Sequence, residues 1–431
     1  LGLMSRNSEK INALNSLIEQ YPKSVYVDQA VFEKGETYTE MDNNSAAVAA
    51  YKEVISRYPN STLAPKAYLK TALALYNGNK KEDALDFYKT VISKYPESSQ
   101  SKRAIAAIKD LSIELGKPEE YSPYASSEPE RDSLTYQAAE NAYVNNDCIK
   151  AVTLFQAYYS RFPKGIFFNE AHNYRAECLL RNKDYPDAFG DYQAIIGNKY
   201  AKYYEHALLN ASGIALYEMK DTAQAYALYV KLFEASTTTA NTYTAILGVM
   251  KTAYKLQKYT EAAAYADRVL DNANSKEGDI NEALYIKAQC AHLMKQDDIA
   301  YINYNRLSMA TVSERAAEAK YMVALLLYNK QEYKASLDTC FRLKNRFASY
   351  DYWVVKGFIL IADDYLAMNN SFQAKATLES IIGNYKGDRA LINEAQAKLD
   401  KLQNDELKKS KIQTVAPSDS IIMEQEPPTN K

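Results

Sequence analysis

The side chains best suited to catalysis or metal binding are few in this sequence and lie far apart. Among its 431 residues are only three histidines, His172, His206 and His292. A metal site or acid–base catalysis needs several such groups to converge, and this spacing offers no converging set. The adjacent carboxylates Asp363 and Asp364 would point roughly 100° apart on a helix and could not share one site. We therefore predict that the protein is not an enzyme and holds no metal or other cofactor.

The cysteines also lack a pattern that indicates chemistry. Cys148, Cys178, Cys290 and Cys340 include no C-x-x-C pair. Most of them fall at core-like positions of helical segments, where a free cysteine acts as a small hydrophobe. We predict no disulfide framework, and cysteine usage leaves the redox compartment open.

Charge and hydropathy exclude two further classes of partner. The 52 basic and 54 acidic residues are interspersed and give a net charge of −2, so no basic stripe is available for nucleic acid. The longest apolar run, Met322–Tyr328, is too short to cross a bilayer. The sequence therefore predicts neither nucleic-acid binding nor a transmembrane span in this chain.

A repeat with a period of 37 residues organises the chain. Shifting the sequence by 37 places Tyr51 on Tyr88 and Tyr58-Pro59 on Tyr95-Pro96. The apolar positions within one unit step as on one face of a helix, and the proline ends that helix. Such a period is typical of stacked helical hairpins. The small residues that open each second helix keep the period farther along the chain: Ala151, Ala188, Ala225, Ala262, Ala300, Ser336 and Ala374.

The repeat unit resembles the tetratricopeptide repeat. Small residues occupy the place in the first helix where that family's helices approach closely: Gly35, Ala72, Ala139, Ala176, Gly213, Ala288, Ala324 and Ala362. An aromatic residue occupies the matching place in the second helix: Tyr51, Tyr88, Phe155, Tyr192, Tyr229 and Tyr304. The resemblance implies an all-α fold, a right-handed superhelix (α-solenoid) of antiparallel helix pairs. About nine repeats would be joined by a partial N-terminal repeat and a C-terminal capping helix.

Breaks in the pattern predict three segments. Residues 1–127 form an N-terminal block that starts within a repeat and ends in a degenerate one, and residues 134–411 form a C-terminal block with its capping helix. Gly116 and Pro118 interrupt the period, so an irregular joint is expected at 116–133. Residues 412–431 have the composition of a disordered tail. Because the first block starts within a repeat, we expect the chain to be a fragment of a longer polypeptide.

The turn between repeats suggests a compartment. Its aromatic-Pro-x-Ser/Gly sequence is similar to the repeats of bacterial outer-membrane assembly lipoproteins and of the Tol-Pal coordinator. This resemblance implies a periplasmic or outer-membrane-associated protein of a Gram-negative bacterium, joined to the envelope through an upstream region.

The resemblance to the tetratricopeptide repeat also implies that a groove lined by the first helices binds a partner. Carried over by phase, the candidate binding residues are Tyr76, Tyr143, Tyr217, Lys251, Tyr254, Tyr285, Tyr321 and Tyr328. A row of tyrosines offers contact area at low entropic cost, which suits a peptide or a helix. The leading hypothesis is a non-enzymatic protein–protein interaction scaffold of the cell envelope. Two alternatives stay open: the groove binds glycan or peptidoglycan fragments, or its rings serve only to pack adjacent helices.

Overall fold

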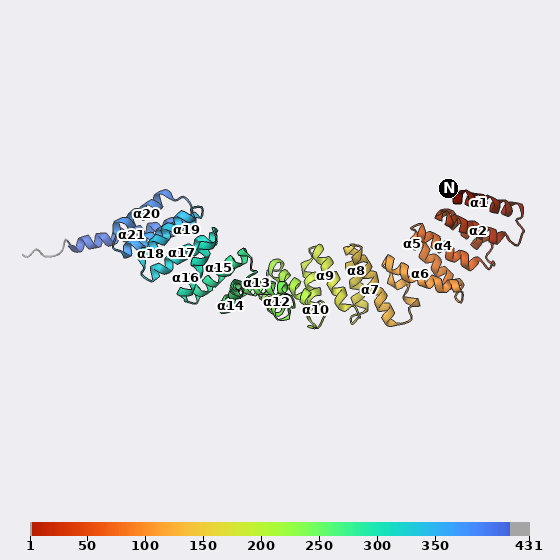
Figure 1. Ribbon diagram of the computed structural model, residues 1–431, viewed down its shortest axis with the longest axis horizontal. Helices are drawn as coiled ribbons and strands as arrows, with labels where there is room; N and C mark the ends of the chain where they lie inside the picture. Colours follow the sequence, from red (N-terminus) through yellow and green to blue (C-terminus); the bar gives the residue numbers. More distant parts are fainter. Residues whose placement is uncertain (1, 414–431) are drawn as a thin grey trace, which may run out of the picture. The chain divides into compact units, whose positions relative to one another are not determined.

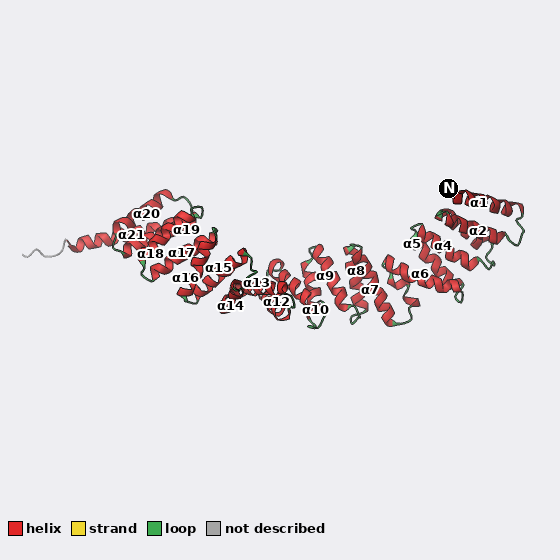
Figure 2. Ribbon diagram, in the orientation of Figure 1, coloured by secondary structure: helices red, strands yellow, loops and turns green. Residues whose placement is uncertain are grey.

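The computed structural model describes residues 2–413, and this part of the chain contains helices and connecting turns but no strand (Figures 1 and 2). The chain divides into two compact units, residues 1–219 and 220–431. Within each unit, every helix packs against the next along the chain. This confirms the predicted all-α stack of helix pairs.

The first unit contains α1 (Gly2–Gln20), α2 (Val27–Glu40), α3 (Asn44–Arg57), α4 (Ala64–Asn77), α5 (Lys81–Lys94), α6 (Ser99–Leu115), the 3₁₀ turns η1 (Pro118–Glu120) and η2 (Ser122–Tyr124), α7 (Glu128–Val144), α8 (Cys148–Arg161), α9 (Phe168–Arg181), α10 (Tyr185–Ile196), α11 (Tyr204–Gly213) and the π-helical η3 (Ile214–Glu218). The second contains α12 (Thr222–Ala235), α13 (Thr239–Lys255), α14 (Tyr259–Leu270), α15 (Glu277–Leu293), α16 (Asp297–Ala310), α17 (Glu314–Asn329), α18 (Tyr333–Arg346), α19 (Asp351–Ala367), α20 (Ser371–Asn384) and α21 (Arg389–Gln413). The tail predicted for 412–431 lies outside the described residues, except that 412 and 413 belong to α21.

The turn inside each helical hairpin has one conformation that recurs with the period of the sequence. A residue in the left-handed region closes the first helix, and the next amide bonds back to it, as Lys80 N does to Leu75 O at 2.9 Å. Asparagine and aspartate tolerate that conformation better than other non-glycine residues, which explains the Asn- and Asp-rich loops. The left-handed positions are Asp42, Asn79, Asn146, Lys183, Lys220, Gln257, Lys295, Gln331 and Asn369.

The turn between repeats ends each second helix as the prolines predict. Helices α3, α5 and α8 stop at the residue before the aromatic-Pro pair, and the amide of Tyr58 still bonds to Val54 O at 2.9 Å. The predicted aromatic positions, from Tyr51 to Tyr304, are all buried. The small residues that open the second helices are buried as well. Local periodicity therefore defines both the helix ends and the core.

Two glycines show where helices approach closely. A Cβ on Gly35 would lie 2.5 Å from Tyr51 Cε1, and one on Gly248 would lie 2.3 Å from the Tyr229 ring. The expectation of a close contact at Gly213 is wrong, because a Cβ there would meet no atom within 4 Å. A π-helical turn begins directly after Gly213, at Ile214, and widens the helix at this point.

The stretch at 116–133 is irregular but packed. Gly116 takes the left-handed conformation that ends α6, and η1 and η2 follow. Tyr121 is buried in one hydrophobic cluster with Leu111 of α6 and Leu134 of α7, and its hydroxyl donates to Glu130 Oε1 at 2.9 Å. Packing therefore continues from α6 to α7. The boundary between the compact units falls after Met219 instead, and the domain division into 1–127 and 134–411 stays a prediction.

The cysteines divide into two kinds. Cys290 and Cys340 are free and buried, as small hydrophobes would be. For Cys148 and Cys178 that expectation is wrong, because they form a disulfide with Cα atoms 5.1 Å apart. Helices α8 and α9 are consecutive and antiparallel, so the start of one lies beside the end of the other. This brings together two residues 30 positions apart.

Candidate functional site

Three of the candidate tyrosines, Tyr76, Tyr143 and Tyr285, donate to carboxylates one repeat farther along the chain. Tyr76 of α4 donates its hydroxyl to Glu114 Oε2 of α6 at 3.1 Å, and Lys81 Nζ lies 2.6 Å from the same carboxylate. The hydrogen bond to Glu114 raises the pKa of Tyr76. The ring keeps 38% of its surface exposed. Tyr76 is therefore held in one orientation and still reaches solvent.

Tyr143 is fixed from three sides. Its ring stacks on Tyr174 of α9 with centroids 4.6 Å apart, and the Arg181 guanidinium lies 5.5 Å from its centroid. Its hydroxyl donates to Glu177, a carboxylate that also accepts from Asn173 at 2.9 Å. Burial, followed by the hydrogen bond to Glu177, raises the pKa of Tyr143 to about 12. The hydroxyl therefore stays protonated and acts as a hydrogen-bond donor at neutral pH.

Tyr217 differs from the other candidates. It lies in the π-helical turn η3 and exposes 63% of its surface. It belongs to the first compact unit, whereas Tyr254 belongs to the second. The two candidates are therefore described separately, each within its own unit.

The second unit has a connected polar and aromatic surface across α13, α15 and α17, which we call the first-helix surface. It comprises Lys251, Tyr254, Glu282, Tyr285, Gln289, Arg315 and Glu318. Lys251 Nζ lies 2.8 Å from Glu282, which also lies 3.6 Å from Arg315. Tyr285 donates its hydroxyl to Glu318 at 3.1 Å, and Gln289 Nε2 donates to the same carboxylate at 2.8 Å.

The electrostatics of this surface follow from partial burial. Burial raises the pKa of Glu318, although its bonds from Tyr285 and Gln289 act in the other direction. Burial and the Glu318 carboxylate raise the pKa of Tyr285 to about 12. Arg315 lies 4.8 Å from the centroid of the Tyr285 ring. The first-helix surface thus presents fixed donors, an aromatic face and both signs of charge.

Tyr321 and Tyr328 lie on α17 and pack against one buried cluster that includes Cys340 and Leu360, but their aromatic partners differ. The Tyr321 ring lies 5.7 Å from that of Trp353 on α19, and Lys356 Nζ lies 5.1 Å from its centroid. Burial raises the pKa of Tyr321 to about 12. Tyr328 meets Tyr333 edge to face at 5.5 Å. Tyr321 therefore belongs to a second aromatic group with Trp353, whereas the ring partner of Tyr328 lies within its own hairpin.

Most of the residues weighed for catalysis have structural partners, whereas His292 Nδ1 lies 4.0 Å from Asp297 and forms no hydrogen bond in the described part of the chain. His172 Nδ1 lies 2.7 Å from Asp191, and His206 Nδ1 lies 2.9 Å from Asn173. Asp363 pairs with Lys398 at 2.7 Å, whereas Asp364 accepts from Ser336, so these carboxylates face different neighbours. Within residues 2–413, no group of three His, Cys, Asp or Glu side chains could hold a metal ion. Among the described helices, none is both long and apolar enough to cross a membrane.

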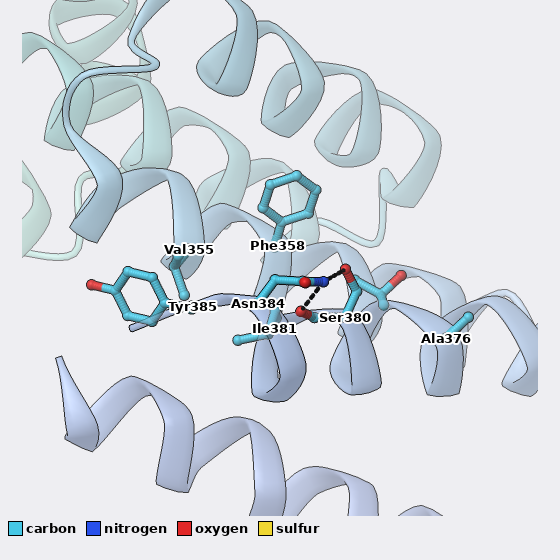
Figure 3. Close-up of a pocket in the computed structure, with 8 residues that line it drawn as sticks. Val355, Phe358, Ala376, Ser380, Ile381, Asn384 and Tyr385 are labelled. Carbon is cyan, nitrogen blue, oxygen red and sulfur yellow. Dashed lines mark hydrogen bonds between the residues drawn. The ribbon is translucent and has the colours of Figure 1, made fainter. Parts of the chain in front are cut away.

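A cavity of about 450 Å³ lies between α19 and α20. Figure 3 shows Phe358, Ile381 and Tyr385 around it, with Asn384 donating to Ser380 O at 3.0 Å and to Ser380 Oγ at 3.3 Å. No side chain that lines it is charged. The repeat pattern did not predict this cavity.

Choosing residues by their position within the repeat did not predict several partners of the candidate tyrosines. Tyr174, Gln289, Arg315 and Trp353 stand outside the predicted set. A search for a tyrosine followed 33 to 38 residues later by glutamate would have found the partners of Tyr76, Tyr143 and Tyr285. That signal spans two repeats, so inspection of one repeat at a time does not show it.

Comparison with known proteins identifies the repeat. Two family models, each described as tetratricopeptide repeat, match the chain, one at residues 29–61 and 66–98 and the other at residues 136–201 and 251–297. A search among curated proteins found no match.

Similar solved structures include two that are described as tetratricopeptide-repeat proteins. One is YrrB, described as a tetratricopeptide-repeat protein with an unusual peptide-binding site, at 18% identity over 49% of this chain and 98% of that chain, with a TM-score of 0.37. Another is a tetratricopeptide repeat protein from Parabacteroides merdae, at 11% identity over 70% of this chain and 98% of that one, with a TM-score of 0.23. A third is yeast Tom70, at 12% identity over 95% and 96% of the two chains, with a TM-score of 0.29.

Proposed function

Because this chain is a tetratricopeptide-repeat protein, we propose that it is a non-enzymatic scaffold that binds a segment of a partner protein on its first-helix surface. Tetratricopeptide repeats generally mediate protein–protein interactions and are typically non-catalytic. The observation that carries the proposal is the linked set of Tyr285, Glu318 and Arg315, with Tyr254 of the preceding first helix packed against the same hydrophobic cluster as Tyr285.

Preorganisation is the physical reason to favour this surface. Binding orders flexible side chains at a cost of about 0.5–1.5 kcal/mol each. Tyr285 is already fixed by Glu318, Gln289 and Arg315, so that cost is met on folding. Tyr254 is half-buried beside them, and burial raises the pKa of its hydroxyl. A partner segment would meet rigid aromatic faces together with the Glu282 and Lys251 charges.

The test uses photo-crosslinking in the full chain. A photoreactive phenylalanine analogue replaces Tyr254, and the matched control replaces Phe341, an exposed aromatic residue on the second helix α18. We expect one protein partner to be captured at position 254 and not at position 341. Equal capture at both positions would contradict the proposal, as would saturable binding to a glycan array without any protein partner.

Once the partner is purified, the contribution of individual side chains to the binding free energy can be measured. Replacing both Tyr254 and Tyr285 with Ala should weaken binding by more than about 2 kcal/mol, as loss of interface hot spots does, without loss of helix content. Tyr304 is the control, because it is fully buried and Tyr304→Ala should damage folding first. If the double variant binds normally, the rings serve only in packing.

We further propose that the protein works in an oxidising compartment of the bacterial envelope. The Cys148–Cys178 disulfide supports this, since disulfides persist in such compartments and are rare in the cytosol. Thiol labelling of protein taken from fractionated cells should find Cys148 and Cys178 oxidised and Cys290 and Cys340 reduced after denaturation. Four reduced thiols in protein from the native host would refute this compartment.

A further inference from the structure

A basic cavity lies among α16, α17 and α18, outside the first-helix surface. It has a volume of about 640 Å³, within the range of small-molecule sites. Three cationic side chains line it: Lys320 from α17, and Arg342 and Arg346 from α18. No carboxylate is among its lining residues. The cavity therefore gathers positive charge without opposing charge of its own.

The three cationic side chains differ in their contacts. Arg346 Nη2 donates to the backbone oxygen of Met309 at 2.8 Å and so links α18 to the end of α16. Arg342 pairs at 2.8 Å with Asp338, which lies on the same helix and is mostly exposed. Lys320 is half-buried and, within residues 2–413, its Nζ makes neither an ion pair nor a hydrogen bond. Burial and the two guanidiniums lower the pKa of Lys320, whereas Asp338 opposes them weakly.

The rest of the lining supplies unused hydrogen-bonding groups. The Tyr301 hydroxyl and the side-chain amides of Asn305 and Asn345 form no hydrogen bond with other residues of the described part of the chain. Val323 and Met309 add apolar surface. An anion placed here would neutralise Lys320 and accept hydrogen bonds from amide or hydroxyl donors.

We propose that this cavity binds a small organic anion, whose carboxylate or phosphate group lies between Lys320 and the Arg342 and Arg346 guanidiniums. The site is independent of the first-helix surface. Tyr321, the neighbour of Lys320, faces Trp353 of α19, while Lys320 faces α16 and α18. A ligand here would bridge α16 and α18 and would stabilise the stack between these two second helices.

The experiment titrates the full chain with inorganic phosphate, citrate and a hexaglutamate peptide at low ionic strength. Calorimetry should show saturable binding of phosphate or citrate, weakened at least tenfold by Lys320→Met and by Arg342→Gln. The control is Lys344→Gln, since Lys344 is exposed on α18 but does not line the cavity, and binding should change less than twofold. Arg342 is itself exposed, so Arg342→Gln keeps the test valid if Lys320→Met folds poorly.

Amine labelling gives a second, site-specific measurement. Trace acetylation followed by mass spectrometry should show Lys320 protected by citrate or phosphate, whereas Lys344 should be labelled equally with and without the anion. Absence of saturable binding by either small anion would overturn the proposal, and so would binding of the hexaglutamate peptide alone. Equal affinity in Lys320→Met and the natural chain would also overturn it.

Discussion

The buried carboxylate of Asp364 should make the second unit less stable as pH rises. Asp364 is fully buried on α19, where Oδ2 accepts from Ser336 Oγ at 2.8 Å and Oδ1 has no partner in the described part of the chain. Burial, with a smaller contribution from Asp363, raises the pKa of Asp364 to about 7. Within residues 2–413, no cation pairs with this carboxylate. The folded state is therefore most stable when Asp364 is protonated.

The sign of the effect follows from proton linkage. Between pH 4 and pH 7 the unfolded chain has lost this proton while the folded chain keeps it, so stability falls as pH rises. One pKa unit corresponds to about 1.4 kcal/mol, and a shift of roughly three units sets a ceiling near 4 kcal/mol. Roughly two of these units are titrated between pH 5 and pH 8, because the unfolded carboxyl has already lost most of its proton at pH 5. Allowing for relaxation around the charge, we expect Asp364→Asn to gain about 1–2.5 kcal/mol relative to the natural chain over this range.

The assay uses the single tryptophan of the chain. Trp353 lies on α19, the same helix as Asp364, so its fluorescence during urea denaturation reports on this part of the stack. That matters because stacked repeats can unfold in parts. Asp363→Asn is the matched control, since Asp363 is half-exposed and pairs with Lys398, and its pH profile should stay close to that of the natural chain. Parallel pH profiles for Asp364→Asn and the natural chain would refute the reasoning.

Three further predictions concern packing. Gly248→Ala should destabilise the second unit by about 1–3 kcal/mol because its Cβ would collide with the Tyr229 ring, whereas Gly213→Ala should not destabilise the first; equal losses in urea titrations would contradict this. Ala176→Leu should lower the Tm more than Tyr254→Ala, because Ala176 is fully buried and Tyr254 is partly exposed; similar Tm shifts would count against it. Trypsin should cut at Lys117 and Arg131 no earlier than at the hairpin turn of Lys183, because Tyr121 packs that stretch; early release of 134–411 would instead support the domain division predicted from sequence.

The sequence by itself determined the repeat architecture. The 37-residue period, the aromatic-Pro turns and the buried rings such as Tyr51 and Tyr304 are local, and the helix ends follow from them directly. The adjacent Asp363 and Asp364 were correctly predicted not to act as a pair. These features depend on chemistry within one hairpin, which a short window of sequence contains.

Only the tertiary structure decided what lies between repeats. The Cys148–Cys178 disulfide, the bond from Tyr285 to Glu318 and the basic cavity around Lys320 each join residues from different helices. The position of Gly213 within the repeat predicted a close helix contact, but the π-helical turn that follows changes the geometry there. Periodicity specifies which side of a helix a residue occupies. Which atom it meets depends on the rotation and offset of the neighbouring helix, and these emerge only when the whole stack packs.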